Sequence, residues 1–113
     1  FDGALADHAV RETKAKYLAG HELVARLRPL IDDWADVTVR LREQLTSTAE
    51  LTDMLRRAGA PSRPEDISLT FDDVRATFPR AMYYRSRYTA LDVAWELGIF
   101  DELVAEVFDR IWA

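Results

Sequence analysis

The chain has 113 residues, a length that suits one domain with one hydrophobic core. Its 49% hydrophobic and 31% charged residues are typical of a folded globular protein rather than a disordered one. The net charge of -5, with no basic stripe, argues against nucleic acid as a partner. The chain has no cysteine, which excludes disulfides and thiol chemistry and fits a cytoplasmic location. No apolar run approaches the roughly 20 residues of a membrane-spanning helix, so we expect no membrane partner.

Apolar residues repeat with helical spacing along almost the whole chain. A weak stripe from Leu5 to Tyr17 predicts a first helix. A stronger stripe over residues 21–45 predicts a long amphipathic helix, which Pro29 either kinks or starts late. This stripe packs within its own domain or forms a seam for a partner helix. Its members are Leu23, Leu27, Leu30, Trp34, Val37, Leu41 and Leu45.

The middle of the chain contains recognisable helix boundaries. Ser47 and Glu50 have the spacing of a capping box, and Gly59 supplies a left-handed stop. Ser62 and Glu65 repeat that spacing and predict a single helical turn. The next helix opens at 70–73 and is bent by a proline, Pro79. Its predicted inner face is formed by Phe71, Val74, Phe78 and Met82.

Two further helices complete the prediction. Thr89 is the expected N-cap of a short helix, with Asp92 as its capping partner and Gly98 at its end. The last helix begins near Asp101. The predicted buried faces are Leu91, Ala94 and Trp95 in the short helix, and Leu103, Val104, Val107, Phe108 and Ile111 in the last one. With no strand periodicity, the sequence predicts an all-α bundle of five or six helices in a single domain over residues 1–113.

Motifs that would carry chemistry are missing from this segment. Its four glycines are well separated, so there is no glycine-rich phosphate loop. His8 and His21 are the only histidines, and neither has a carboxylate at the i, i+4 spacing of a metal-binding helix together with a clear supporting shell. We therefore assign no catalytic, cofactor-binding or metal-binding residue.

Arg85 and Arg87 stand next to the predicted start of the helix at Thr89, where the helix dipole is already positive. Three explanations remain open. Asp92 or an acid of another helix neutralises them, they lie at a domain interface, or they bind an anion. Two guanidinium groups, exposed amides and a threonine hydroxyl together suit a phosphate or carboxylate. The candidate anion, phosphate or interface residues are Arg85, Arg87, Tyr88 and Thr89.

Three stretches of sequence resemble a known family. They are "KAKYLAG" at 14–20, "LRRAGAPSRPEDISL" at 55–69 and "YYRSRYTALDVAWELG" at 83–98. Together they resemble the C-terminal helical region of glycerol-1-phosphate dehydrogenases, in the superfamily of iron-containing alcohol dehydrogenases and dehydroquinate synthases. The likeness covers about residues 10 to 103 and is most specific in the second and third stretches.

The resemblance implies an enzyme of two lobes. An N-terminal α/β lobe would bind NAD(P), and a helical lobe would hold a divalent metal, most often zinc, through an aspartate and two histidines. The metal would polarise the substrate while hydride passes between the nicotinamide and sn-glycerol 1-phosphate or dihydroxyacetone phosphate. Neither His8 ("ADHAV") nor His21 ("AGHEL") has the flanks of the family's metal ligands, so no ligand and no cofactor residue is carried over.

The chain starts with Phe1 rather than Met, and we expect it to be a fragment that lacks the nucleotide-binding lobe and the metal-ligand segment. Its partners would be that missing lobe and, in a homo-oligomer, a second subunit. The alternative is a free-standing helical interaction module. Exposure of Phe100, Phe108 and Trp112 would favour a missing lobe, and a closed core would favour the module.

Overall fold

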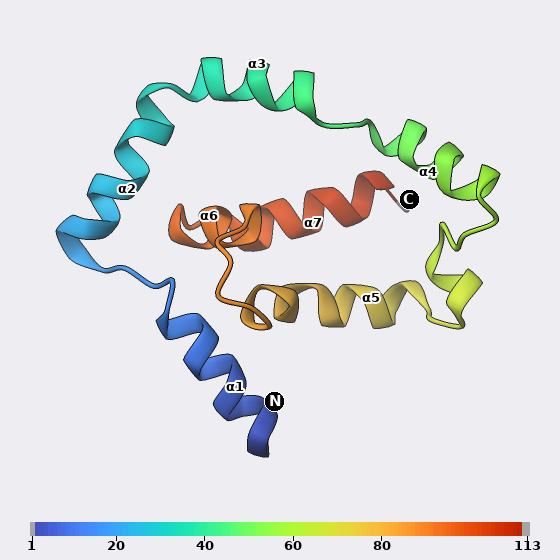
Figure 1. Cartoon of the computed structure of the whole chain (residues 1–113), viewed down its shortest axis with the longest axis horizontal. Helices are drawn as coiled ribbons and strands as arrows, with labels where there is room; N and C mark the ends of the chain where they lie inside the picture. The colour runs from blue at the N-terminus through green and yellow to red at the C-terminus, as the bar shows by residue number, and fades with distance from the viewer. Residues whose placement is uncertain (1, 112–113) are drawn as a thin grey trace. The chain divides into compact units, whose positions relative to one another are not determined.

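The computed structural model describes residues 2–111, and every regular element within them is helical (Figure 1). The predicted all-α class is therefore confirmed. The sequence predicts one domain over residues 1–113, and the structure groups the chain into two compact units. Unit 1 comprises residues 2–18 and 70–111, and unit 2 comprises residues 19–69.

Unit 2 contains the helices α2 (Gly20–Asp32), α3 (Trp34–Gln44) and α4 (Thr48–Arg57) and the short 3-10 helix η1 (Pro64–Ile67). The long helix predicted over 21–45 is thus divided at Asp33, which leaves helical geometry with φ -103° and ψ 18°. Pro29 lies inside α2 and does not start it. Asp33 donates its amide to the Pro29 carbonyl at 3.0 Å, and α3 then begins at the next residue.

The two capping predictions in unit 2 have different outcomes. Ser47 and Glu50 form the expected box at the start of α4, with the Ser47 amide donating to the Glu50 carboxylate at 3.1 Å. The predicted pair of Ser62 and Glu65 is wrong in its acid. Because η1 begins at Pro64, the third helical position falls on Asp66. Its Oδ2 atom accepts the amides of Ser62 at 2.8 Å and Arg63 at 3.0 Å.

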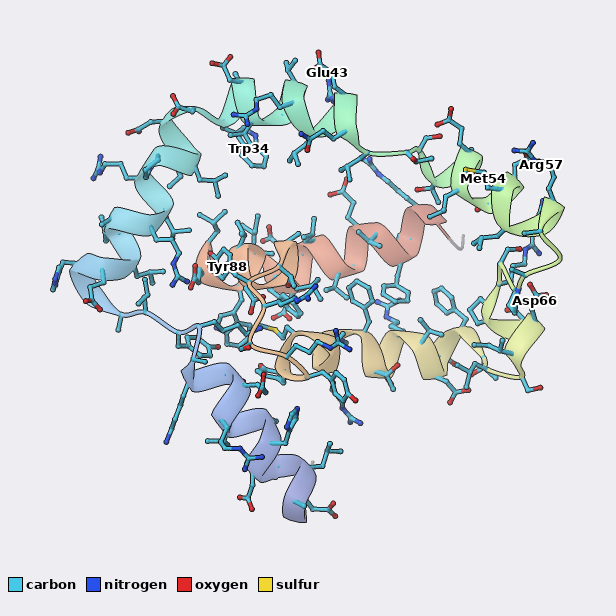
Figure 2. The ribbon with its side chains drawn as sticks, in the orientation of Figure 1. Trp34, Glu43, Met54, Arg57, Asp66 and Tyr88 are labelled. Carbon is cyan, nitrogen blue, oxygen red and sulfur yellow. The ribbon has the colours of Figure 1, made fainter. Side chains whose placement is uncertain are left out.

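The apolar stripe of unit 2 is only partly buried. Leu27 is buried, as expected for packing within the domain. Leu45, at the end of the stripe, has 67% of its surface exposed. Trp34 in the middle of the stripe is 53% exposed, and Met54 of α4 is 51% exposed (Figure 2).

Unit 1 contains α1 (Gly3–Lys14), α5 (Phe71–Thr77), the 3-10 helix η2 (Phe78–Tyr83), α6 (Ala90–Glu96) and α7 (Phe100–Ile111). Pro79 ends the α-helical geometry, and the chain continues as η2. α7 runs beside α5 and η2 (Figure 1), and Phe108 joins them. The ring of Phe108 is fully buried and meets Phe71 and Phe78 edge-on, at centroid distances of 5.4 and 5.3 Å.

A second cluster of unit 1 consists of the buried Met82, Ala94 and Phe100. Trp95, predicted to be buried, is 46% exposed. Its ring packs edge-on against the ring of Phe100, with the ring centroids 5.8 Å apart. Because consecutive helix residues point in different directions, the burial of Ala94 leaves the neighbouring Trp95 at the edge of this cluster, where it is only partly covered. Gly98 ends α6 as predicted, with φ +73°. Phe100 and Phe108 are thus buried, whereas Trp112 and the Ile111 side chain lie outside the described residues.

Candidate functional site

Three side chains at intervals of four residues attach the N-terminal helix to the segment 82–92 of unit 1. His8 and Glu12 lie on α1, and Lys16 lies in the turn just after it. The ring Nε2 of His8 is 2.9 Å from the carbonyl oxygen of Tyr84, and Glu12 accepts the amide of Ser86 at 2.7 Å. Residues four apart share a helix face, so one side of α1 satisfies backbone groups of an irregular segment.

Lys16 makes the most buried of these contacts. Its ammonium group lies 2.6 Å from the Oδ1 of Asp92, and both side chains are buried. The same nitrogen donates to the carbonyl oxygen of Met82 and makes a longer contact of 3.5 Å with that of Arg87. One cation therefore joins the two ends of the segment 82–87 to the first turn of α6.

The chain's own carboxylates meet the polar groups of residues 86–89. Asp92 accepts the amide of Thr89 at 2.8 Å and its hydroxyl at 2.7 Å, which confirms Asp92 as its capping partner. The hydroxyl of Tyr88 donates to the carboxylate of Glu96. Glu12 holds Ser86, as described above. The anionic groups near the start of α6 are thus the carboxylates of Glu12 on α1 and of Asp92 and Glu96 on α6.

These contacts set the protonation of the acids. Burial raises the pKa of Asp92, but hydrogen bonds from Lys16 and Thr89, with the Lys16 charge, outweigh it and hold this pKa below its usual value. Hydrogen bonds from Ser86 lower the pKa of Glu12. Both carboxylates are therefore held in the charged form that accepts hydrogen bonds.

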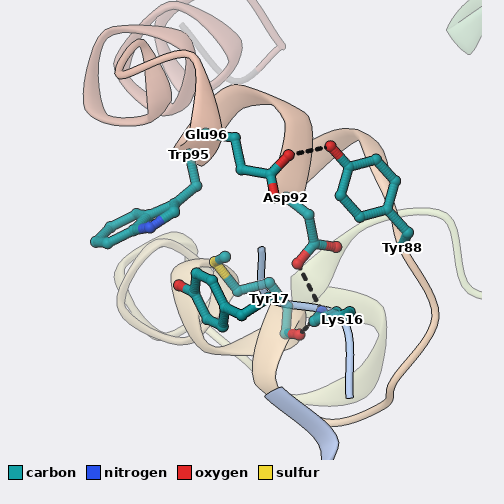
Figure 3. Close-up of a pocket in the computed structure, with 7 residues that line it drawn as sticks. Lys16, Tyr17, Tyr88, Asp92, Trp95 and Glu96 are labelled. Atoms are coloured by element: carbon teal, nitrogen blue, oxygen red, sulfur yellow. Dashed lines mark hydrogen bonds and ion pairs between the residues drawn. The ribbon is translucent and has the colours of Figure 1, made fainter. Parts of the chain in front are cut away.

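A small cavity lies between these groups (Figure 3). Its volume is about 10 Å³, which is room for about one water molecule. Its walls carry one ammonium, two carboxylates and three aromatic rings. The lining residues are Lys16, Tyr17, Met82, Tyr88, Asp92, Trp95 and Glu96. Burial raises the pKa of Tyr17, with smaller contributions from its neighbours. The cavity is too small for a substrate.

The four candidate residues have different surroundings. Tyr88 and Thr89 donate to the carboxylates of α6, so the Thr89 hydroxyl is already engaged. The guanidinium of Arg85 lies 6.0 Å from the centre of the Tyr84 ring. Both arginine side chains are exposed, and Asp92 pairs with Lys16 instead of neutralising them. The binding of an anion by Arg85 and Arg87 stays a prediction.

The histidines lie in different units. His8, in unit 1, contacts the Tyr84 carbonyl, and His21 is in unit 2. Within residues 2–111, no group of three or more histidine or acidic side chains is placed to hold a metal ion. The described residues do not fit the metal that the resemblance implies, so we derive no reaction step through it.

None of the described helices combines the length and apolar character needed to cross a membrane. Comparison of the chain with family models, with curated proteins and with solved structures found no match. Within residues 2–111, the structure by itself defines an all-helical fold with a buried Lys16–Asp92 ion pair.

Sequence reasoning missed the roles of His8 and Glu12 on α1 and of Lys16 in the turn after it. Lys16 was quoted as part of "KAKYLAG", but nothing in the sequence marked its side chain as buried. The one available signal was the spacing of His8, Glu12 and Lys16, which places three polar groups on one face of a helix whose apolar stripe is weak.

We expect the Lys16–Asp92 pair to make the stability of unit 1 sensitive to acid. A lowered folded-state pKa contributes stability above the ordinary value of 3.8, and this contribution is lost as pH falls through the folded-state pKa. Urea unfolding of the chain and of Asp92→Asn at several pH values below about 5 tests this. The difference in unfolding free energy between the two should shrink as the pH falls. A constant difference would contradict the prediction.

Proposed function

We propose that this chain is the helical C-terminal part of a metal-dependent, NAD(P)-linked dehydrogenase of the cytoplasm. The enzyme would interconvert sn-glycerol 1-phosphate and dihydroxyacetone phosphate. Alone, the segment is inactive, because the resemblance assigns the cofactor loop and the metal ligands to the preceding part of the enzyme. Its role is to enclose the metal site and to pack against the N-terminal lobe, with a second subunit as a further partner.

The observation that carries this proposal is the Lys16–Asp92 pair. Lys16 belongs to the "KAKYLAG" stretch and Asp92 to the "YYRSRYTALDVAWELG" stretch, two of the three that carry the resemblance. A chance likeness in separate stretches gives no reason for their polar residues to meet in one buried contact. The exposed Trp34, Leu45 and Met54 of unit 2 also suit a surface that another lobe covers.

A free-standing, non-catalytic interaction module is the alternative function. Phe100 and Phe108 favour it, because both are buried inside unit 1, where a missing lobe would have left such side chains exposed. The two functions differ in the size of the natural polypeptide. An antibody against this segment should detect a much longer chain in a lysate of the source organism if the enzyme proposal holds. A band at 13.0 kDa would favour the module.

If the longer chain exists, its purified form should oxidise NADH or NADPH in the presence of dihydroxyacetone phosphate and a divalent metal. The chelated enzyme is the control, because removal of the metal should abolish the reaction. A long chain with no such activity under either cofactor would contradict the proposed reaction while leaving the fragment assignment intact.

In that enzyme, we expect Arg87→Glu to raise the KM for the phosphorylated substrate far more than the KM for unphosphorylated glycerol. The reason is that a guanidinium which binds the phosphate contributes nothing to the binding of glycerol, which has no phosphate. Arg42→Glu, an exposed arginine of α3, is the matched control. Equal changes in both KM values would show that Arg87 does not contact the phosphate.

A further inference from the structure

Unit 1 has a groove that the proposed function does not use. It lies between α1 and η2 and has a volume of about 470 Å³, which is within the range of small-molecule sites. Its lining residues are Ala6, Ala9, Val10, Thr13, Lys14, Arg80 and Tyr83. None of them is among the four candidate anion residues, so the groove is a separate feature of the same unit.

The shape of the groove follows from the spacing of its α1 residues. Ala6, Ala9, Val10 and Thr13 recur at three- and four-residue intervals and so form one face of the helix over two turns. The alanines have only a methyl group, which leaves depth between α1 and η2. Val10 is 52% exposed, an apolar side chain in contact with solvent at this site. The floor therefore suits an apolar body of modest length.

The charge of the groove is opposite to that of the chain. The net charge is -5, yet the groove carries two cations and no carboxylate. Lys14 extends from α1 and Arg80 from η2, so each wall contributes one. Both side chains are exposed, and neither forms an ion pair within residues 2–111.

Thr13 lines the groove, but its hydroxyl is not a contact for a ligand there. Its hydroxyl oxygen is buried and has no hydrogen-bond partner among the described residues. Because almost none of this oxygen is exposed, a molecule in the open groove does not reach it, and recognition there depends on the apolar lining and the two cations.

We propose that this groove binds a monomeric amphiphilic carboxylate, with its apolar chain on the alanine face and its anionic head between Lys14 and Arg80. Charge complementarity selects the carboxylate over a neutral or cationic amphiphile. The apolar face, two helical turns long, selects a ligand of medium chain length over a protein helix, which needs several anchors along a longer groove. The site requires neither the missing lobe nor the dehydrogenase reaction.

The probe is octanoate, compared with octan-1-ol and octylammonium, which have the same chain and different heads. Amide chemical shifts of the chain are followed by NMR during titration. Octanoate should shift the amides of residues 6–14 and 80–83 with a dissociation constant on the order of a millimolar. Octylammonium should cause much smaller shifts there.

Two variants separate the head group from the apolar chain. The double variant Lys14→Glu and Arg80→Glu should weaken octanoate binding about five- to ten-fold, whereas Arg42→Glu of unit 2 should leave it unchanged. Ala6→Leu should reduce binding by filling the groove without a change of charge.

Equal binding of octanoate and octan-1-ol would overturn the proposal. The groove would then be an apolar patch of the kind that another protein surface covers. Shifts centred on exposed apolar residues of unit 2 would overturn it as well. The dehydrogenase proposal stands or falls separately, since its assays do not involve this groove.

Discussion

Replacing Lys16 with methionine is expected to lower the free energy of unfolding of unit 1 by about 3 to 5 kcal/mol. Methionine keeps most of the apolar stem and removes the ammonium group. The carboxylate of Asp92 then stays buried with Thr89 as its remaining partner in the capping box. A buried charge without its counter-ion is the reason for so large a loss.

Urea unfolding and amide hydrogen exchange measure this effect. Exchange matters because the chain has two units, and only the amides of α6 and of segment 82–92 should lose protection first. Lys14→Met is the matched control, since Lys14 is an exposed lysine of α1. A loss below about 1 kcal/mol for Lys16→Met would place the pair in the class of exposed ion pairs and contradict its burial.

The double variant Lys16→Met and Asp92→Asn tests directly whether the two side chains interact. Asparagine removes the unpaired charge but keeps an oxygen that accepts from Thr89. The double variant should therefore lose less stability than the sum of the two single variants. Additive losses would show that the two side chains do not interact.

Local rules predicted the helices of this chain well, because those rules act within a few residues. The capping box at Ser47 and the glycine stop at Gly98 depend only on neighbours in sequence. Where a prediction failed, a competing local constraint was overlooked. Pro64 moved the η1 cap from Glu65 to Asp66, and the break at Asp33 divided a stripe that periodicity alone reads as continuous.

The candidate site was less predictable, because its contacts join distant segments. The sequence drew attention to Arg85 and Arg87 through their position next to a helix start. It gave no indication that Lys16 would become the counter-ion of Asp92, since pairing between distant helices leaves no periodic signal. Burial separates the two cases: Lys16 is enclosed, and both arginines are exposed.

Phe108→Ala is expected to cost about 3 to 5 kcal/mol, as large as the loss at Lys16 but for an apolar reason. Phe108 is the one described side chain with 0% of its surface exposed, and its ring lies edge-on against Phe71 and Phe78. The guanidinium of Arg75 lies 5.8 Å from its centre. Truncation to alanine leaves a cavity between α7 and the α5–η2 segment and removes three ring contacts together.

The loss should appear in urea unfolding as a lower midpoint for unit 1. Leu45→Ala is the control, because it also shortens an apolar side chain but at a position that is 67% exposed. Phe108→Leu should fall between the two, since leucine refills part of the cavity. If Phe108→Ala cost no more than Leu45→Ala, α7 would not be anchored through this ring.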